Sequence, residues 1–265
     1  MGPSRIFDAS SPPIMTQPTM SSRDAELDPT VAPPPKQEKS SLLDDFMDIF
    51  YAPSAVFARR ANLGFWIPLI IVSVLSGVIF IANRDLMEPI MEAEMTRSMA
   101  KASTQLTPEQ MESARKVTST FGAVGAFIFP PIMVIVLGVV IWLVGKFVDA
   151  KQTLNAAIGV AVFAFVPRIV EGIVNRVQGL FVDPSTINSR YSLTLGLGRF
   201  FDADTASPML LALVGRIDLF TIWVTVLIAI GLAVTGKISR GRAAIAAAVI
   251  WLVGALPTFA AALRG

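Results

Sequence analysis

The sequence predicts an all-α integral membrane protein with five transmembrane helices, an N-terminal interfacial amphipathic helix and a disordered N-terminal tail. Hydrophobic residues make up 53% of the 265 residues and charged residues only 16%, whereas soluble domains carry about 25% charged residues. Five apolar stretches each reach the roughly 20 residues that an α-helix needs to cross a bilayer. They cover approximately Leu63–Ala82, Phe121–Phe147, Leu154–Leu180, Met209–Thr235 and Ala243–Leu263.

Two regions precede the bundle, which is expected over residues 63–265. Residues 1–40 are rich in proline, serine and threonine. Such a segment buries too little apolar surface to offset its ordering entropy, which predicts a disordered tail. In residues 41–62, apolar residues recur at helical spacing opposite acidic ones, which predicts an amphipathic helix in the membrane interface before Pro53 turns the chain. The apolar residues are Leu42, Leu43, Phe46, Ile49 and Phe50, and the acidic ones are Asp44, Asp45 and Asp48.

Basic residues beside the spans predict the orientation. The connection between the fourth and fifth spans holds Lys237, Arg240 and Arg242 and no acidic residue. Short loops with an excess of lysine and arginine stay in the cytoplasm. The N-terminus is therefore expected in the cytoplasm and, with an odd number of spans, the C-terminus outside.

The loop between the first two spans contains two patterns. Thr107, Pro108 and Gln110 match a capping box, which predicts a helix start that runs on into the second span. Ahead of it, methionines recur every four residues from Met87 to Met99. Thioethers select copper(I), but an adaptable apolar face toward lipid or a neighbouring helix is the favoured interpretation.

Cysteine and histidine are both absent from the sequence. Their absence excludes disulfides, the usual zinc and haem sites, thiol chemistry and serine–histidine dyads. The net charge of +2 offers no basic surface of the kind that binds nucleic acid. We therefore expect no metal site, no cofactor and no nucleic-acid partner.

Four charged residues fall inside the third and fourth spans. Arg168 and Glu171 are three residues apart and share a helix face, while Arg216 and Asp218 lie in the fourth span. If the two spans run in opposite directions, the two pairs lie at depths that agree within about 3 Å. We expect one buried network without net charge. One interpretation is structural: the network holds the two helices together and fixes their register. The other is functional: the network relays ions or protons, or binds a lipid head group.

Several short motifs, in their order, resemble bacterial members of the Yip family, proteins named for interaction with Rab/Ypt GTPases. The motifs are IFYAPSAVF, WIPL, LTPEQ, IDLFTIWVTVLIAIGLAV and GKISRGRAA, and the resemblance covers residues 42–263. It implies a five-span protein of the bacterial inner membrane with a cytoplasmic N-terminal tail, and no established catalytic residues. It also implies that cytosolic partners meet the chain near the acidic and aromatic residues Asp44, Asp45, Phe46, Asp48 and Phe50.

The expected function is that of a non-enzymatic scaffold that organises the membrane or recruits protein partners to it, alone or as a homo-oligomer. The alternative is a small transporter or channel whose polar path is the buried charge network. An intramembrane enzyme is the least favoured class, because the chain has no histidine, no cysteine and no paired intramembrane aspartates.

Overall fold

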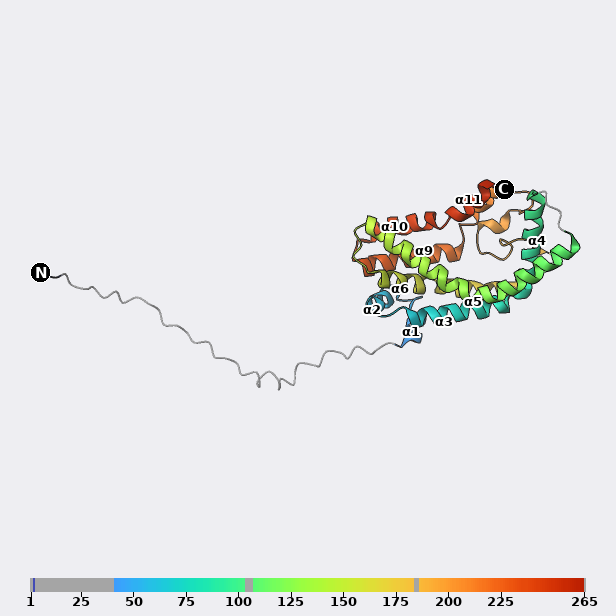
Figure 1. Ribbon diagram of the computed structural model, residues 1–265. Coiled ribbons are helices and arrows are strands. Elements are labelled where there is room, and N and C mark those ends of the chain that lie inside the picture. Colours follow the sequence, from blue (N-terminus) through green and yellow to red (C-terminus); the bar gives the residue numbers. More distant parts are fainter. Residues whose placement is uncertain (1, 3–40, 103–106, 184–185, 265) are drawn as a thin grey trace. The chain divides into compact units, whose positions relative to one another are not determined.

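The computed structural model describes residues 2, 41–102, 107–183 and 186–264, and the regular elements of this part are helices (Figure 1). The predicted tail, residues 1–40, lies outside the described residues apart from Gly2. Residues 40–265 form one compact unit. Its elements are α1 Leu42–Asp48, α2 Pro53–Arg60, α3 Trp66–Ala82, α4 Arg84–Ala102, α5 Pro108–Phe147, α6 Leu154–Ala164, α7 Val166–Gly179, η3 Leu197–Phe200, α8 Pro208–Val214, α9 Leu219–Gly236, α10 Arg240–Val253 and α11 Leu256–Arg264.

The predicted all-α membrane fold is confirmed. In the described part, four helical segments are long and apolar enough to cross a membrane, and the number is five if α3 and α4 count as one span bent by 75°. The helix α3 has 17 residues, a rise of about 25 Å, and ends at the bend. The four segments are Val124–Phe147, Leu154–Gly179, Leu219–Gly236 and Arg240–Leu263.

The predicted start of the helix that becomes the second span is also confirmed. Thr107 accepts a hydrogen bond from the Gln110 backbone N–H at 3.3 Å, and the Gln110 side chain accepts one from the Thr107 N–H at 2.9 Å. These two bonds satisfy donors that have no partner inside the helix. The helix α5 then runs without interruption for 40 residues into the membrane-spanning segment.

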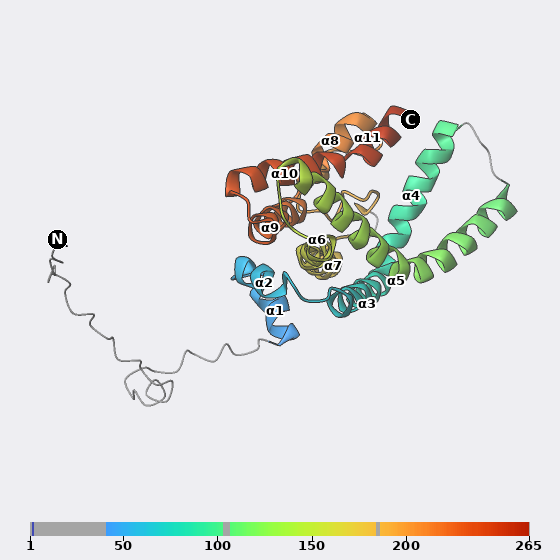
Figure 2. The same cartoon turned by 60° about the vertical axis from the view of Figure 1, so that its left-hand side comes forward.

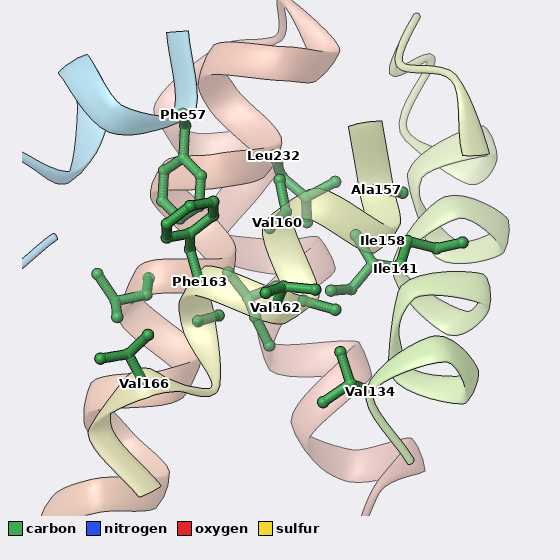
Figure 3. Packing of buried hydrophobic residues seen from close by; sticks show 14 of the residues in the cluster. Phe57, Val134, Ile141, Ala157, Ile158, Val160, Val162, Phe163, Val166 and Leu232 are labelled. Carbon is green, nitrogen blue, oxygen red and sulfur yellow. The ribbon is translucent and has the colours of Figure 1, made fainter. Parts of the chain in front are cut away.

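The core of the unit forms around α6. This helix packs against α5, α9, α3 and α2, and Figure 2 shows α6 and α7 end-on with these helices around them. Figure 3 shows the side chains of Phe163 from α6 and Phe57 from α2, which both belong to this core. A glycine permits the close approach of α5 to α6, because a Cβ at Gly138 of α5 would lie 2.7 Å from the backbone Cα of Ile158.

The predicted interfacial helix of residues 41–62 is divided into two helices that form a hairpin. The capping box of Ser41 and Asp44 begins α1, and α1 ends before the turn that leads to Pro53 at the start of α2. Proline fixes φ and lacks an N–H, so it suits the first turn of a helix and not its interior. We call residues 41–60 the α1–α2 hairpin.

A second, smaller core lies at the end of the unit opposite the α9–α10 turn (Figure 1). Two residues of α4 and two of the segment that follows α7 form it: Leu86, Ile90, Ile187 and Leu193. Arg97 of α4 holds this segment through Asp204, at 2.7 Å, and through the Asn188 carbonyl oxygen, at 2.8 Å. We call α4 together with residues 186–207 the cap.

Candidate functional site

The third span is interrupted next to its charged residues. The helix α6 ends at Ala164 and α7 begins at Val166, so Phe165 flanks both helices. Pro167 lies in the first turn of α7 and has no N–H with which to continue the hydrogen bonds of α6. The interruption places Arg168 and Glu171 in the first two turns of a new helix.

The fourth membrane-spanning helix begins at Leu219, so Arg216 and Asp218 precede it and do not lie inside a span of residues 209–235 as predicted. A segment of the cap pairs with the residues between α8 and α9. Leu197 donates its backbone N–H to the Ile217 carbonyl oxygen at 3.0 Å, within an antiparallel bridge between Gly196 and Asp218. Backbone groups at membrane depth must find partners within the protein. A Cβ at Gly196 would lie 2.7 Å from the Ile217 oxygen, so only glycine permits this approach.

Arg168 connects the third span to the start of the fourth. One guanidinium nitrogen donates to Glu171 at 2.6 Å and lies 3.9 Å from the Asp218 carboxylate, and the other donates to the Thr221 hydroxyl at 2.6 Å. The Thr221 hydroxyl donates in turn to Asp218. Asp218 also accepts the N–H groups of Phe220 and Thr221, at 2.9 and 3.0 Å, and so caps α9. The Asp218 carboxylate therefore both caps α9 and pairs with Arg168.

Arg216 does not join this cluster and contacts the last span. It donates to the Trp251 carbonyl oxygen at 2.7 Å, and its guanidinium carbon lies 5.3 Å from the centroid of the Trp251 ring. That carbonyl belongs to the last turn of α10, where the helix dipole attracts a cation. Arg216 makes no ion pair within the described residues. The structure thus brings three of the four predicted charged residues together and places the fourth against α10.

The α1–α2 hairpin is closed by buried ion pairs. The Asp45 carboxylate accepts Arg59 at 2.6 Å and pairs with Arg60, and its side chain is 1% exposed. Arg59 also contacts Asp48 at 2.6 Å. Two cations on α2 thereby neutralise acidic side chains of α1.

Aromatic side chains attach the hairpin to the bundle. The Phe46 ring centroid lies 5.4 Å from that of Phe163, and the Phe50 centroid lies 5.3 Å from that of Trp223. With Asp45 buried as well, three of the residues expected to contact a partner contact the protein itself. The physical reason is that α2 packs on α6 and α9 and turns this side of α1 inward.

The opposite side of α1 is exposed and apolar. Leu43 and Met47 of α1, and Tyr51 in the turn that follows it, stand at intervals of four residues and are 72%, 60% and 81% exposed. Asp44 is exposed beside them, and hydrogen bonds from the Ser41 backbone N–H and then the Ser41 hydroxyl lower the pKa of its carboxyl group. We call Leu43, Met47 and Tyr51 the hairpin stripe.

Comparison with known proteins identifies the family of this chain. A sequence model of the Yip1 domain matches residues 47–262. The chain belongs to the Yip1 domain family. It is similar to the membrane protein YknW of Bacillus subtilis (strain 168), with 27% identity over 218 residues that cover 81% of this chain and 86% of YknW. None of the solved structures matches the chain.

The site of this Yip1-family protein includes residues that the sequence pattern did not assign to it. Thr221 joins Arg168 to Asp218, and the Trp251 carbonyl oxygen accepts Arg216. Thr221 lies three residues after Asp218, the spacing of a capping residue and its N3 partner, and this spacing is a usable signal. No local sequence pattern predicts Trp251 as the hydrogen-bond acceptor of Arg216, because the acceptor is a backbone group of another span.

The described residues contain no group of three or more aspartates and glutamates that could hold a metal ion. The methionines of α4 do not share one environment. Met87 packs on the small core of the cap, whereas Met91 is 41% exposed, and the side chain of Met99 lies outside the described residues. This division agrees better with an adaptable apolar face than with ligands that converge on one ion.

Proposed function

We propose that this Yip1-family membrane protein is a non-enzymatic scaffold that recruits a protein partner to the cytoplasmic face of a bacterial inner membrane. The hairpin stripe supports this proposal, because three large apolar side chains stay exposed on an element that is otherwise closed by ion pairs and aromatic contacts. A rigid apolar surface of this kind loses little conformational entropy when a partner binds.

Charge favours a protein over the bare lipid surface as the occupant of the stripe. The hairpin holds three acidic residues, Asp44, Asp45 and Asp48, and two basic ones, Arg59 and Arg60. Asp44 is exposed directly beside the stripe, and a carboxylate there repels anionic head groups. The fitting partner is an amphipathic helix with apolar anchors and a basic edge.

Photo-crosslinking tests the proposal. A benzoylphenylalanine residue at Met47 is expected to capture one defined protein, and the same residue at Phe46, which faces Phe163, is not. The captured protein is then purified and titrated against the wild type and Leu43→Ser, whose affinity should fall about tenfold because a buried anchor is lost. Capture of lipid alone, or unchanged affinity of Leu43→Ser, would contradict the proposal, and capture of a second copy would identify a homo-oligomer instead.

The proposed orientation has its own test, since the chain has no cysteine. A membrane-impermeant thiol reagent should label Thr205→Cys in the cap from outside, and Lys237→Cys in the α9–α10 turn only after the cytoplasmic face is opened. The reverse pattern would place the N-terminus outside and the hairpin away from the cytoplasm.

Transport is the second candidate function, and one observation favours it. Interrupted helices with charged residues at the interruption are typical of transporter binding sites, and the α6–α7 interruption and the start of α9 both contribute to the Arg168 cluster. Thr221→Cys places a thiol within this cluster. Rapid labelling by the impermeant reagent, at a rate near that of Thr205→Cys, would favour a water-filled path. Absence of labelling would favour a dry contact between spans and hence the scaffold.

A further inference from the structure

Two connections of the bundle meet at the end of the unit where the α1–α2 hairpin lies. The residues between α5 and α6 lie beside the turn between α9 and α10, because the Lys151 backbone N–H donates to the Gly236 carbonyl oxygen at 3.0 Å. The Asn155 side chain at the start of α6 donates to the Leu63 carbonyl oxygen, just after α2, at 3.0 Å. Five exposed basic residues lie on the two connections and the adjoining helix ends, and we call them the basic surface: Lys146, Lys151, Lys237, Arg240 and Arg242.

Buried polar contacts hold the two connections together. The Gln152 side chain is buried, accepts the Thr235 hydroxyl at 2.6 Å and donates to the Ile141 carbonyl oxygen at 3.4 Å. A count of basic residues is sufficient to set the orientation of a membrane protein, and no contact between the connections is needed for that purpose. Fixing several like charges in one place has an electrostatic cost, which a bound anion would offset.

Most of the positive charge of the basic surface is not neutralised by the described residues. Asp149 is the only acidic residue of the two connections, and it pairs with Arg242 at 3.2 Å. Lys151, Lys237 and Arg240 make no ion pair within the described part of the chain. By contrast, both arginines of the hairpin pair with acidic side chains. Three cations of the basic surface are therefore available to an anion.

The basic surface lies at the level of the lipid head groups. Two membrane-spanning segments end at Phe147 and Gly236, and another begins at Arg240, so the basic residues flank the hydrocarbon core. Exposed apolar side chains continue from them along the same helices: Phe147 is 88% exposed, and Leu143 of α5 and Ile245 of α10 are 47% and 64% exposed. A ligand with an anionic head and apolar chains can contact both kinds of surface, whereas an acidic peptide can use only the charge.

We propose that the basic surface binds the phosphate head groups of anionic phospholipids. Lys151, Lys237 and Arg240 contact the phosphate, and the exposed apolar faces of α5 and α10 contact the acyl chains. The basic surface is separate from the hairpin stripe, and binding does not depend on which side of the membrane it faces. The test is therefore independent of the proposed scaffold function.

The test uses the full chain in nanodiscs of phosphatidylcholine with a small fraction of pyrene-labelled phosphatidylglycerol. Energy transfer from the tryptophans to pyrene measures how strongly the lipid associates, and pyrene-labelled phosphatidylcholine is the reference. The wild type should prefer phosphatidylglycerol at least about tenfold at low salt, because each basic residue near the head groups contributes about fivefold. The preference should decrease in about 1 M salt, which screens charges beyond about 3 Å.

Variants assign the preference to the basic surface. Lys151→Gln and Arg240→Gln should each lower it about fivefold, the contribution expected of one basic residue. Arg240→Lys keeps the charge and should keep the preference, which separates loss of charge from damage to the fold. The matched control is Arg199→Gln, which removes an exposed arginine of the cap and should leave the preference unchanged.

Three results would overturn the proposal. They are equal association of the two labelled lipids, a preference that Lys151→Gln and Arg240→Gln both retain, and an equal loss in Arg199→Gln.

The alternative occupant of the basic surface is an acidic segment of the chain itself, residues 24–28, with the sequence DAELD. The variant that combines Asp24→Asn, Glu26→Gln and Asp28→Asn tests it. A preference for phosphatidylglycerol that is absent from the wild type and appears only in this variant would identify the segment as the occupant and overturn the lipid proposal. The same preference in both proteins would support the lipid.

Discussion

Asp45 is the buried carboxylate of α1 that pairs with both arginines of α2. Asp45→Ala leaves Arg59 and Arg60 without their shared partner, and removal of one member of a buried pair costs about 3–5 kcal/mol. Because the Arg59 side chain is 36% exposed and water screens it, we expect about 2–3 kcal/mol for release of the hairpin. Hydrogen exchange of residues 41–60 measures this free energy. The matched control is Asp48→Ala, whose side chain is 39% exposed and which should cost less than about 1 kcal/mol. Equal effects of the two variants would contradict this ranking.

Asp44 makes the start of α1 sensitive to acid. Its pKa is lowered in the folded state by the Ser41 backbone N–H and then by the Ser41 hydroxyl, so its contribution is present above the ordinary aspartate pKa and is lost as the pH falls through the folded value. Protection of the first α1 amides against hydrogen exchange should therefore decrease below about pH 4. In Asp44→Asn this protection should be lower at neutral pH and should not decrease further. An unchanged acid response of Asp44→Asn would assign the effect to another group.

At the scale of the elements, Arg168 and Glu171 distinguish contact between spans from a binding site. Arg168→Gln leaves Glu171 and Asp218 without a cation and should lower the free energy of unfolding by about 3 kcal/mol. The double variant with Glu171→Gln should lose less than the single one, because a neutral amide needs no counter-charge inside the membrane. Thermal unfolding in one detergent compares the wild type, the two single variants and the double variant. A double variant that loses as much as the two single ones together would show that the pair does not act as a unit.

The approach of α5 to α6 depends on a glycine. A Cβ at Gly138 would lie 2.7 Å from the Ile158 Cα, and backbone cannot yield as a side chain does, so Gly138→Ala should cost about 1–3 kcal/mol. Gly159 in α6 has nothing within 4 Å of its virtual Cβ. Gly159→Ala is therefore the matched control, and it should be neutral or stabilise by up to about 1 kcal/mol. The two melting temperatures measure the difference. Because alanine favours a helix more than glycine does, an equal change in both variants would contradict the packing interpretation.

For the molecule as a whole, residues 40–265 should be sufficient for the membrane fold. They form a compact unit, and the Yip1 domain match, residues 47–262, lies inside it. Because residues 40–265 form a compact unit by themselves, a chain that starts at residue 40 should insert in the membrane and melt within about 2 °C of the full chain. Lower melting of the shorter chain would show that the N-terminal residues stabilise the unit.

The sequence by itself determined the class of the protein, the approximate spans, the start of α5 and the family. Each depends on local information: the spans on runs of apolar residues, the helix start on Thr107 and Gln110, and the family on ordered motifs. A span needs about 20 apolar residues, and a capping box needs only four consecutive positions. Such patterns are present in the chain before it folds.

Only the tertiary structure decided which charges meet and which side of the hairpin faces outward. The sequence predicted that Arg216 joins Asp218 in one charge network. The position of α10 instead gave Arg216 the Trp251 carbonyl oxygen as its hydrogen-bond acceptor. The pattern of α1 showed two faces, but the buried one includes Asp45, because Arg59 and Arg60 approach it from α2. A charged residue can be buried wherever a partner from another element neutralises it, and no local pattern shows where that element will lie.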